Sequence, residues 1–188
     1  MKTKQLTIAK RIAHLQPCSE SRDWASGYTS PTKAWRECIQ GDWMLWLLGR
    51  LSGVPESPAR RKLVRCCADC AEVSLPIFEQ RYPNDSRVRD CIAACRQWAD
   101  GEISIVELRA AAYAADAADA ADAAHAAAYV ADAAYAAADA AYAAHAAAYV
   151  AYAAADAAYA AARTQMLAKC ADIVRQHYPK PPTVVKGK

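Results

Sequence analysis

The chain has 188 residues, a formal net charge of +3, eight cysteines and only six glycines. This length is enough for one domain with a real core, and six scattered glycines exclude a phosphate-binding loop or a glycine-rich dinucleotide turn. Residues 1–5 carry two lysines and no apolar segment, so we expect no secretory signal, a cytoplasmic location and reduced cysteines.

The first predicted helix covers residues 6–16, whose amphipathic pattern ends before Pro17. Residues 17–34 contain proline, glycine and several serines, which predict a loop. Trp24 and Tyr28 are the residues expected to pin this loop to the core.

The second predicted helix, Lys33–Leu51, follows a proline and can be capped by Ser30 or Thr32. Its second half is apolar around most of the circumference, so we expect it to be the central buried helix. Three tryptophans on one helix are more often core than a recognition surface. These tryptophans are Trp35, Trp43 and Trp46.

Residues 52–58 form a clear break, and a long amphipathic helix is predicted over 59–80. Pro76 lies inside that range and is expected to bend or end the helix. The next predicted helix, Arg87–Asp100, is capped by Ser86 or Asp85 and ended by Gly101.

Ser104 and Glu107 form a capping box for a helix that leads into an alanine tract, residues 110–162. Alanine occupies 36 of these 53 positions, and neither glycine nor proline interrupts them, so the tract is predicted to be helical. Its larger residues recur every three or four positions and form one ridge of Tyr, Asp and His on an alanine surface. Close packing of helices through their alanine methyl groups is expected.

A single helix from Ile103 to His177 would be roughly 110 Å long, out of scale for a compact domain of this size. We therefore predict at least one reversal in the tract, near Tyr129-Val130 or Tyr149-Val150, where a β-branched residue weakens the helix. The sequence around these pairs is duplicated. A repeated unit of this kind can stack on itself, and such a duplication can also arise by slippage during replication. The alternative is a long rod that forms a homodimer.

The fold prediction is an all-α, single-domain helical bundle with long alanine-rich helices and tight helix–helix packing. It divides into an amphipathic half rich in Trp and Cys (1–102), an alanine-rich helical half (103–178) and a basic tail (179–188). The last predicted helix runs from Arg163 to Tyr178. Its inward residues are Met166, Leu167, Cys170, Ile173 and Val174.

Charge is unevenly distributed along the chain. The tract holds six Asp and no Lys or Arg, so the remainder carries +9. The acidic ridge argues against nucleic acid as a partner, and the basic residues elsewhere are not clustered enough to argue for it. An Asp every few residues also argues against a membrane span.

Several residue sets could carry chemistry, and each has a simpler explanation that we favour. Cys66 with Cys70 and Cys91 with Cys95 could bind zinc, but buried cysteine is common in cores. Asp122-x-x-His125 resembles half of a bundle metal site, but it is a single copy with no matching Glu, so we favour a surface Asp–His pair. We expect no metal, no cofactor and no catalytic residue.

Asp69 and Glu72 flank Cys70 beside the basic group Arg60, Arg61 and Arg65, and we expect buried carboxylate–arginine pairing between helices. A nucleophilic Cys70 would need a nearby base. The four histidines are all remote from it in sequence. They are His14, His125, His145 and His177.

A family resemblance covers roughly residues 17–175. The motifs that carry it are Trp35-x-x-Cys38, Gly41-Asp-Trp-Met-Leu-Trp-Leu-Leu-Gly49, Ala68-Asp-Cys-Ala-Glu72, Tyr82-Pro83 and Trp98-Ala-x-Gly-Glu-Ile103 before the alanine tract. Together they resemble the immunity proteins, family five, of bacterial polymorphic-toxin loci, whose relatives also occur in phages. The resemblance implies an all-helical, non-enzymatic protein that binds and neutralises a partner without a cofactor.

The first functional hypothesis is therefore an immunity or counter-defence protein that occludes a toxin or host-defence macromolecule. Tyrosine is enriched in binding hot spots, and regularly spaced acids select a basic partner surface. The predicted partner-binding residues are Tyr129, Asp132, Tyr135, Asp139, Tyr142 and Tyr149.

The alternative is a binder of a small anionic ligand, such as a nucleotide, in a pocket between helices. That pocket would lie between the tryptophan helix and the basic turn that follows the break. Its predicted ligand-binding residues are Arg60, Arg61, Arg65 and Trp43. An ice-binding alanine helix is a third, weaker hypothesis, because bulky tyrosines spoil a flat face.

Overall fold

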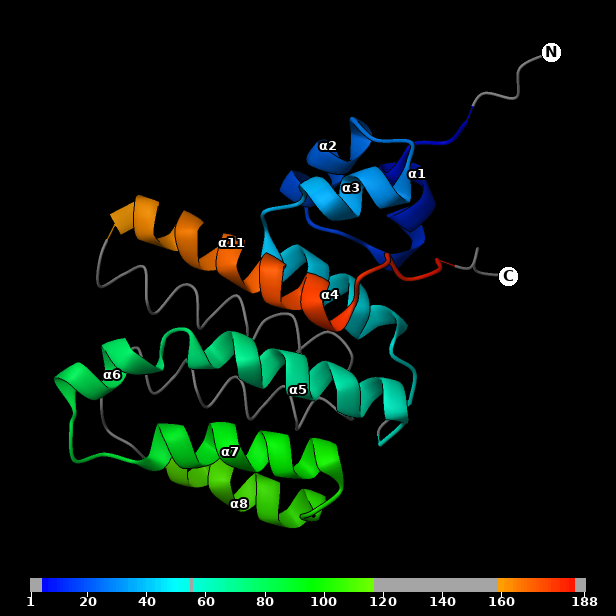
Figure 1. The fold of residues 1–188 in the computed structure, drawn as a ribbon. Helices are drawn as coiled ribbons and strands as arrows, with labels where there is room; N and C mark the ends of the chain where they lie inside the picture. Colours follow the sequence, from blue (N-terminus) through cyan, green and yellow to red (C-terminus); the bar gives the residue numbers. More distant parts are fainter. Residues whose placement is uncertain (1–4, 55, 117–158, 185–188) are drawn as a thin grey trace.

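Helix α5 (Pro58–Glu72) runs through the middle of the computed structural model, which describes residues 5–54, 56–116 and 159–184 (Figure 1). The helix begins where the Ser57 Oγ accepts the backbone N–H of Arg60 at 3.2 Å, with proline in the first turn. Apolar side chains and small residues recur along it and are fully buried, including Leu63 and Val64. The prediction that 33–51 is the central buried helix is therefore wrong, because that position belongs to α5.

The other helices form layers on either side of α5. Helices α4 (Gly41–Leu51) and α11 (Tyr159–His177) lie on one side, and α7 (Arg87–Asp100) and α8 (Ile105–Asp116) lie on the other (Figure 1). Every regular element of the described residues is helical, which confirms the predicted all-α class.

The predicted helix Lys33–Leu51 is in fact two helices, α3 (Pro31–Glu37) and α4, separated by an extended residue, Cys38. The predicted cap is present, since the Ser30 Oγ accepts the backbone N–H of Lys33 at 3.3 Å. The break has a tertiary cause. Arg175 of α11 donates through Nη1 to the carbonyl oxygens of Trp35 (3.2 Å) and Cys38 (2.7 Å) and so satisfies backbone groups that a continuous helix would use.

The loop predicted over residues 17–34 is also wrong, because α2 (Ser19–Ser26) forms there. It packs on α1 (Ile8–Ile12), which continues into a 3-10 turn, Ala13–Leu15. Ala25 is buried in this contact. Burial against α1 therefore stabilises a short helix whose own sequence is polar and serine-rich.

The helix predicted over 59–80 ends at Glu72, and α6 (Leu75–Arg81) follows. Pro76 lies in the first turn of α6, where its missing N–H is tolerated, so it ends the long helix as predicted.

The predicted start and end of α7 and the predicted start of α8 are confirmed. Asp85, rather than Ser86, accepts the first backbone N–H of α7, from Arg87 at 3.1 Å, and Gly101 ends that helix with φ of 82°. The Ser104–Glu107 capping box is present in both directions, at 3.3 and 2.7 Å.

The two described ends of the alanine tract, 110–116 and 159–162, are helical as predicted. They belong to α8 and α11, which lie on opposite sides of α5. The predicted reversal near Tyr129-Val130 or Tyr149-Val150 lies outside the described residues. In α11, the inward residues predicted from the sequence are buried or packed against the core.

Candidate functional site

An apolar cavity, which we call the tryptophan pocket, lies where α1, α2, α3 and α4 meet the C-terminal segment Pro181–Val184. Its volume is about 420 Å³. The side chains that shape it most are Trp24, Trp35, Trp43, Trp46, Met44, Leu47, Ile8, Ile12 and Arg11. Four indoles therefore surround one cavity, although only three of them were grouped from the sequence.

Aromatic contacts fix the shape of the pocket. The rings of Trp24 and Trp43 are 5.9 Å apart between centroids, and the ring of Tyr28 lies 4.6 Å from that of Trp24. Trp35 is buried and donates its indole N–H to the carbonyl oxygen of Tyr178 at 2.8 Å. This bond fixes the position of Trp35 in the pocket wall. Trp24 and Trp43 are only partly buried.

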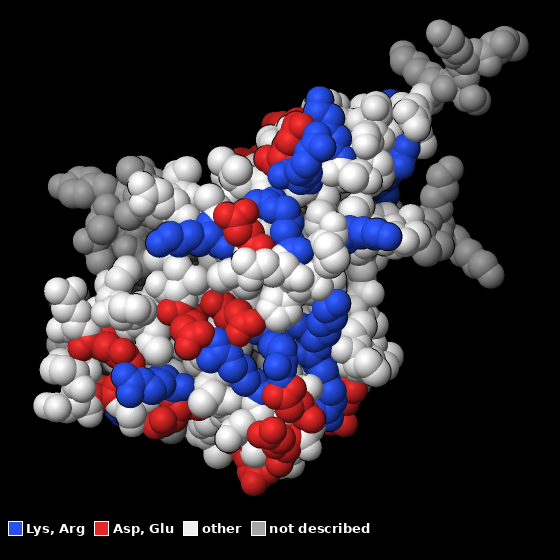
Figure 2. All heavy atoms as spheres, in the orientation of Figure 1, with Lys and Arg blue, Asp and Glu red and all other residues white. Residues whose placement is uncertain are grey.

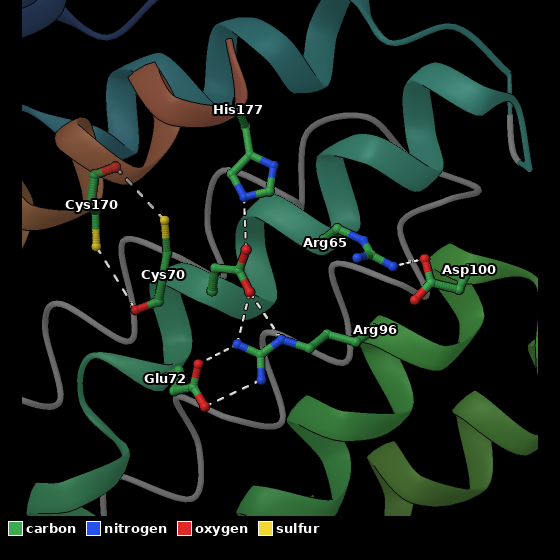
Figure 3. Close-up of polar contacts among 8 residues, drawn as sticks. Arg65, Cys70, Glu72, Arg96, Asp100, Cys170 and His177 are labelled. Carbon is green, nitrogen blue, oxygen red and sulfur yellow. Dashed lines mark hydrogen bonds and ion pairs between the residues drawn. The ribbon is translucent and has the colours of Figure 1, made fainter.

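A second cluster, which we call the Asp69 network, joins α5, α7 and α11 (Figure 3). Asp69 Oδ1 accepts from Arg96 Nε at 2.9 Å and from Nη2 at 2.7 Å, and Asp69 Oδ2 contacts His177 Nε2 at 2.7 Å. Glu72 also accepts from Arg96, with one contact at 3.2 Å. The carboxylates of Glu72 and Asp69 raise the pKa of the Arg96 guanidinium.

Asp69 and Glu72 pair with an arginine of another helix as predicted, but the arginine is Arg96 of α7, and both carboxylates are partly exposed rather than buried. His177 is remote in sequence, yet the fold places it against Asp69 (Figure 3). Figure 2 shows acidic and basic side chains interleaved over the face formed by α5 and α7. Such pairing stabilises the contacts between helices. It also leaves this face without a large patch of one charge.

The three arginines predicted to bind an anionic ligand do not meet at the tryptophan pocket with Trp43. Arg60 is buried and donates from Nη2 to the carbonyl oxygen of Gly53 at 2.8 Å. Arg61 lies over the ring of Trp98 at 4.8 Å and donates to its carbonyl oxygen, and Arg65 pairs with Asp100. Each of the three thus has a structural contact, and the ligand site remains a prediction.

The cysteines lie mostly in the core. Cys66 and Cys70 sit on α5, with Cys70 against Cys170 of α11, where each thiol lies about 4 Å from the other residue's carbonyl oxygen (3.8 and 4.0 Å). Cys91 and Cys95, the second pair considered for zinc, lie on α7. No group of three or more His, Cys, Asp or Glu in the described ranges is arranged to hold a metal ion.

Cys70 is a poor candidate nucleophile in this position. It is completely buried, and hydrogen bonding with Cys170 and Cys66 together with burial raises its pKa well above the ordinary thiol value. The protonated thiol is the weakly reactive form. This geometry supports core packing, which is the role favoured from the sequence.

The predicted partner-binding residues lie outside the described part of the chain, as do Asp122 and His125, so their interactions remain predictions. The ridge residues concerned are Tyr129, Asp132, Tyr135, Asp139, Tyr142 and Tyr149. Residues that sequence reasoning missed are Arg11 and the segment Pro181–Val184. A basic residue in a short helix and a proline-rich tail gave no local signal that they would meet.

These features define an all-α protein with an indole-lined cavity and with charged side chains that pair across helices. A family model described as Imm-5 like putative immunity protein matches residues 54–181, and the chain belongs to this family. The family resemblance seen in the sequence is thus confirmed, although the Trp35–Gly49 motif lies outside the matched residues. No curated protein and no solved structure gives a significant match.

None of the helices in the described ranges is both long enough and apolar enough to span a membrane.

Proposed function

We propose that this protein is a non-enzymatic immunity protein that neutralises a toxin or a host-defence protein by binding to it and occluding its active surface. The observation that carries this proposal is the family match, which covers residues 54–181. A binding role needs no reactive group, and it agrees with the burial of the one cysteine considered as a nucleophile, Cys70.

The surface proposed to meet the partner is the ridge of Tyr and Asp in the alanine tract. Seven tyrosines in the tract supply large contact area at low entropic cost, and six aspartates supply negative charge. A partner with a basic active surface, as in an enzyme that acts on nucleic acid or another polyanion, suits this chemistry. A protein partner, a cytoplasmic location and possible homodimer formation are part of the proposal.

Stoichiometry provides the test, with a toxin that co-purifies with this protein as the partner. Increasing amounts of the protein are added to a fixed amount of toxin, and residual toxin activity is measured. Occlusion predicts a linear loss of activity that ends at a fixed ratio of the two proteins. Inhibition that continues to grow with time at a hundredfold excess of toxin would instead indicate an enzyme and would overturn the proposal.

A variant test addresses the ridge. Replacement of Tyr135, Asp139 and Tyr142 by Ala is expected to leave helicity by circular dichroism intact and to weaken toxin binding at least a hundredfold, because hot-spot residues often cost 2 kcal/mol or more each. A control variant with Lys10 and Asp23 changed to Ala alters exposed residues of α1 and α2. Equal binding by both variants would remove the ridge from the interface, and loss of helicity in the first would make the ridge part of the core.

The alternative function, binding of a small anionic ligand by Arg60, Arg61, Arg65 and Trp43, has its own test. A ligand that binds the folded state raises the melting temperature by mass action. Millimolar ATP or GTP should therefore raise the melting temperature if this alternative is right, and an Arg65→Gln variant should lose the effect. An unchanged melting temperature across nucleotides would leave protein binding as the better explanation.

A further inference from the structure

The tryptophan pocket has the dimensions of a small-molecule site. Its volume of about 420 Å³ falls in the range of roughly 300–1,000 Å³ that is typical of ligand pockets. Its walls come from four helices and from the segment Pro181–Val184, which follows α11. Val184 packs against the small cluster of Ala9, Ile12 and Ala25, so the C-terminal segment is a fixed part of the wall.

The lining is almost entirely apolar. Trp24, Trp43 and Trp46 are partly buried, and the aromatic faces of Trp24 and Trp43 are held together at 5.9 Å. Trp35 has its indole N–H bonded to Tyr178 and therefore contributes its apolar ring surface. An apolar ligand body would gain the transfer free energy of leaving water in such a cavity.

One charge distinguishes this cavity from a plain apolar hollow. Arg11 is the only ionisable Asp, Glu, Lys or Arg side chain among the described residues that line it, and no carboxylate lies on its walls. Arg11 donates from Nε to the carbonyl oxygen of Leu6 at 3.3 Å, which orients the guanidinium. The two Nη atoms, which are the donors suited to a carboxylate, are not used in that bond.

The sign of this charge decides between two ligand classes. Clustered indoles also suit quaternary ammonium ions, which bind over aromatic faces. A guanidinium on the same wall repels such a cation and attracts an anion, since like charges in a partly desolvated cavity are unfavourable. The cavity therefore favours an apolar anion.

We propose that the tryptophan pocket binds a small amphipathic carboxylate, with its aliphatic or aromatic body against the indoles and its carboxylate at Arg11. This site is separate from the Asp69 network and from the alanine tract. Most of its lining precedes residue 54, where the family match begins, so the inference does not depend on the proposed immunity function.

The test compares three ligands with the same ten-carbon chain, all below the concentrations at which they form micelles. Isothermal titration calorimetry on the full-length protein measures decanoate, decanol and decyltrimethylammonium. Decanoate is expected to bind about tenfold more tightly than decanol, which is the usual contribution of one charge-assisted hydrogen bond. The ammonium ligand is expected to bind more weakly than decanol. Equal affinities for all three, or no binding of decanoate, would overturn the proposal.

Two variants locate the site. Arg11→Gln should weaken decanoate binding about tenfold and leave decanol binding unchanged. Lys10→Gln is the matched control, because Lys10 is the exposed neighbour of Arg11 on α1 and does not line the pocket. If the two variants bind decanoate equally well, Arg11 is not the anion-binding group and the proposal fails.

A blocking variant tests the cavity itself. Thr32 is an exposed residue at the rim, and Thr32→Trp should fill the entrance and reduce the affinity for both decanoate and decanol at least tenfold. Thr29→Trp adds the same side chain at an exposed position that does not line the pocket. Circular dichroism and melting temperature establish that each variant is folded, and unchanged binding by a folded Thr32→Trp variant would place the ligand elsewhere.

Discussion

At Gly41 the absence of one methyl group determines how closely two helices approach. A Cβ added there would lie 2.5 Å from the Cβ of Cys170 and 2.8 Å from the backbone N of Ala171. The obstacle is mostly the backbone of α11, which cannot move without moving the helix. The first residue of α4 is therefore required to be glycine for steric reasons, although its backbone conformation is ordinary.

We expect Gly41→Ala to destabilise the protein by about 1–3 kcal/mol, as overpacked substitutions in cores do. Gly27→Ala is the control, since a Cβ there meets its nearest neighbour, the Trp24 carbonyl oxygen, at an ordinary 3.5 Å. Urea unfolding followed by circular dichroism measures both. Equal stability of the two variants would show that α4 can shift away from α11 at little cost.

Cys38, in the break between α3 and α4, couples stability to pH. Burial raises the pKa of this thiol from 9.0 to about 11, with a smaller contribution from Asp42 in the same direction, opposed by a hydrogen bond to Gln40 and by Arg175. The folded state therefore holds this proton more tightly than the unfolded state does. The resulting stabilisation is complete below about pH 9 and is lost as the pH rises towards 11.

We expect the free energy of unfolding to fall by roughly 2–3 kcal/mol from this thiol alone between pH 8.5 and pH 11. Cys38→Ala should have a shallower decline with pH than the wild type, whatever its absolute stability. Cys18→Ala is the control, because Cys18 is exposed. The comparison uses urea unfolding at several pH values, and identical slopes for all three proteins would contradict the assignment.

At the scale of elements, the Asp69 network connects three helices that are far apart in sequence. Asp69 on α5 binds Arg96 on α7 and His177 on α11, and its side chain is 31 % exposed. Because these side chains are partly exposed, solvent screens their charges. The network therefore stabilises the fold less than a fully buried one would. Its geometry nevertheless fixes the rotation of α5 relative to both neighbours.

Asp69→Asn is expected to destabilise the protein by about 1 kcal/mol, because it weakens the hydrogen bonds to Arg96 and His177 while it preserves shape. Asp172→Asn is the matched control, since its pair with Arg175 lies within α11 and the Asp172 side chain is 69 % exposed. The control should change stability by less than about 0.5 kcal/mol. Thermal unfolding distinguishes the two, and equal effects would mean that Asp69 acts as an ordinary surface charge.

At the scale of the whole molecule, the helices before residue 54 lie outside the family match but are joined to the matched core. Trp35 bonds to the carbonyl of Tyr178, and Arg175 bonds to the carbonyls of Trp35 and Cys38. The C-terminal segment then packs on α1 and α2 through Val184. These contacts attach α1, α2 and α3 to the end of α11, whereas α4 packs directly on α11 and α5.

We therefore expect Trp35→Phe to lower the protection of α1–α3 amides against hydrogen exchange, by about tenfold or more, and to leave α5 and α7 amides almost unchanged. The physical reason is loss of the bond to Tyr178 together with some ring volume. Trp46→Phe is the control, because Trp46 lies on the same pocket but is only partly buried and makes no such bond to the end of α11. A uniform loss of protection in all helices would show that the chain unfolds as one unit.

The local sequence determined the starts of α3, α5 and α8 and the end of α7. Ser30, Ser57, Gly101 and the Ser104–Glu107 box act within one turn of the helix end they define, so neighbours in sequence suffice to predict them. The all-α class and the family followed from patterns of the same kind. The inward face of α11 was also readable, because helical periodicity alone selects it.

Tertiary structure alone decided where helices break without a local signal and which side chains meet. The break at Cys38 depends on Arg175, 137 positions away, and α2 depends on burial against α1. Arg96 and His177 reach Asp69, and Arg11 joins four tryptophans in the lining of one pocket, only after the helices have packed. Helix caps depend on atoms that neighbouring residues already hold close together. The Asp69 network and the tryptophan pocket depend on segments far apart in sequence, and these meet only when the core packs.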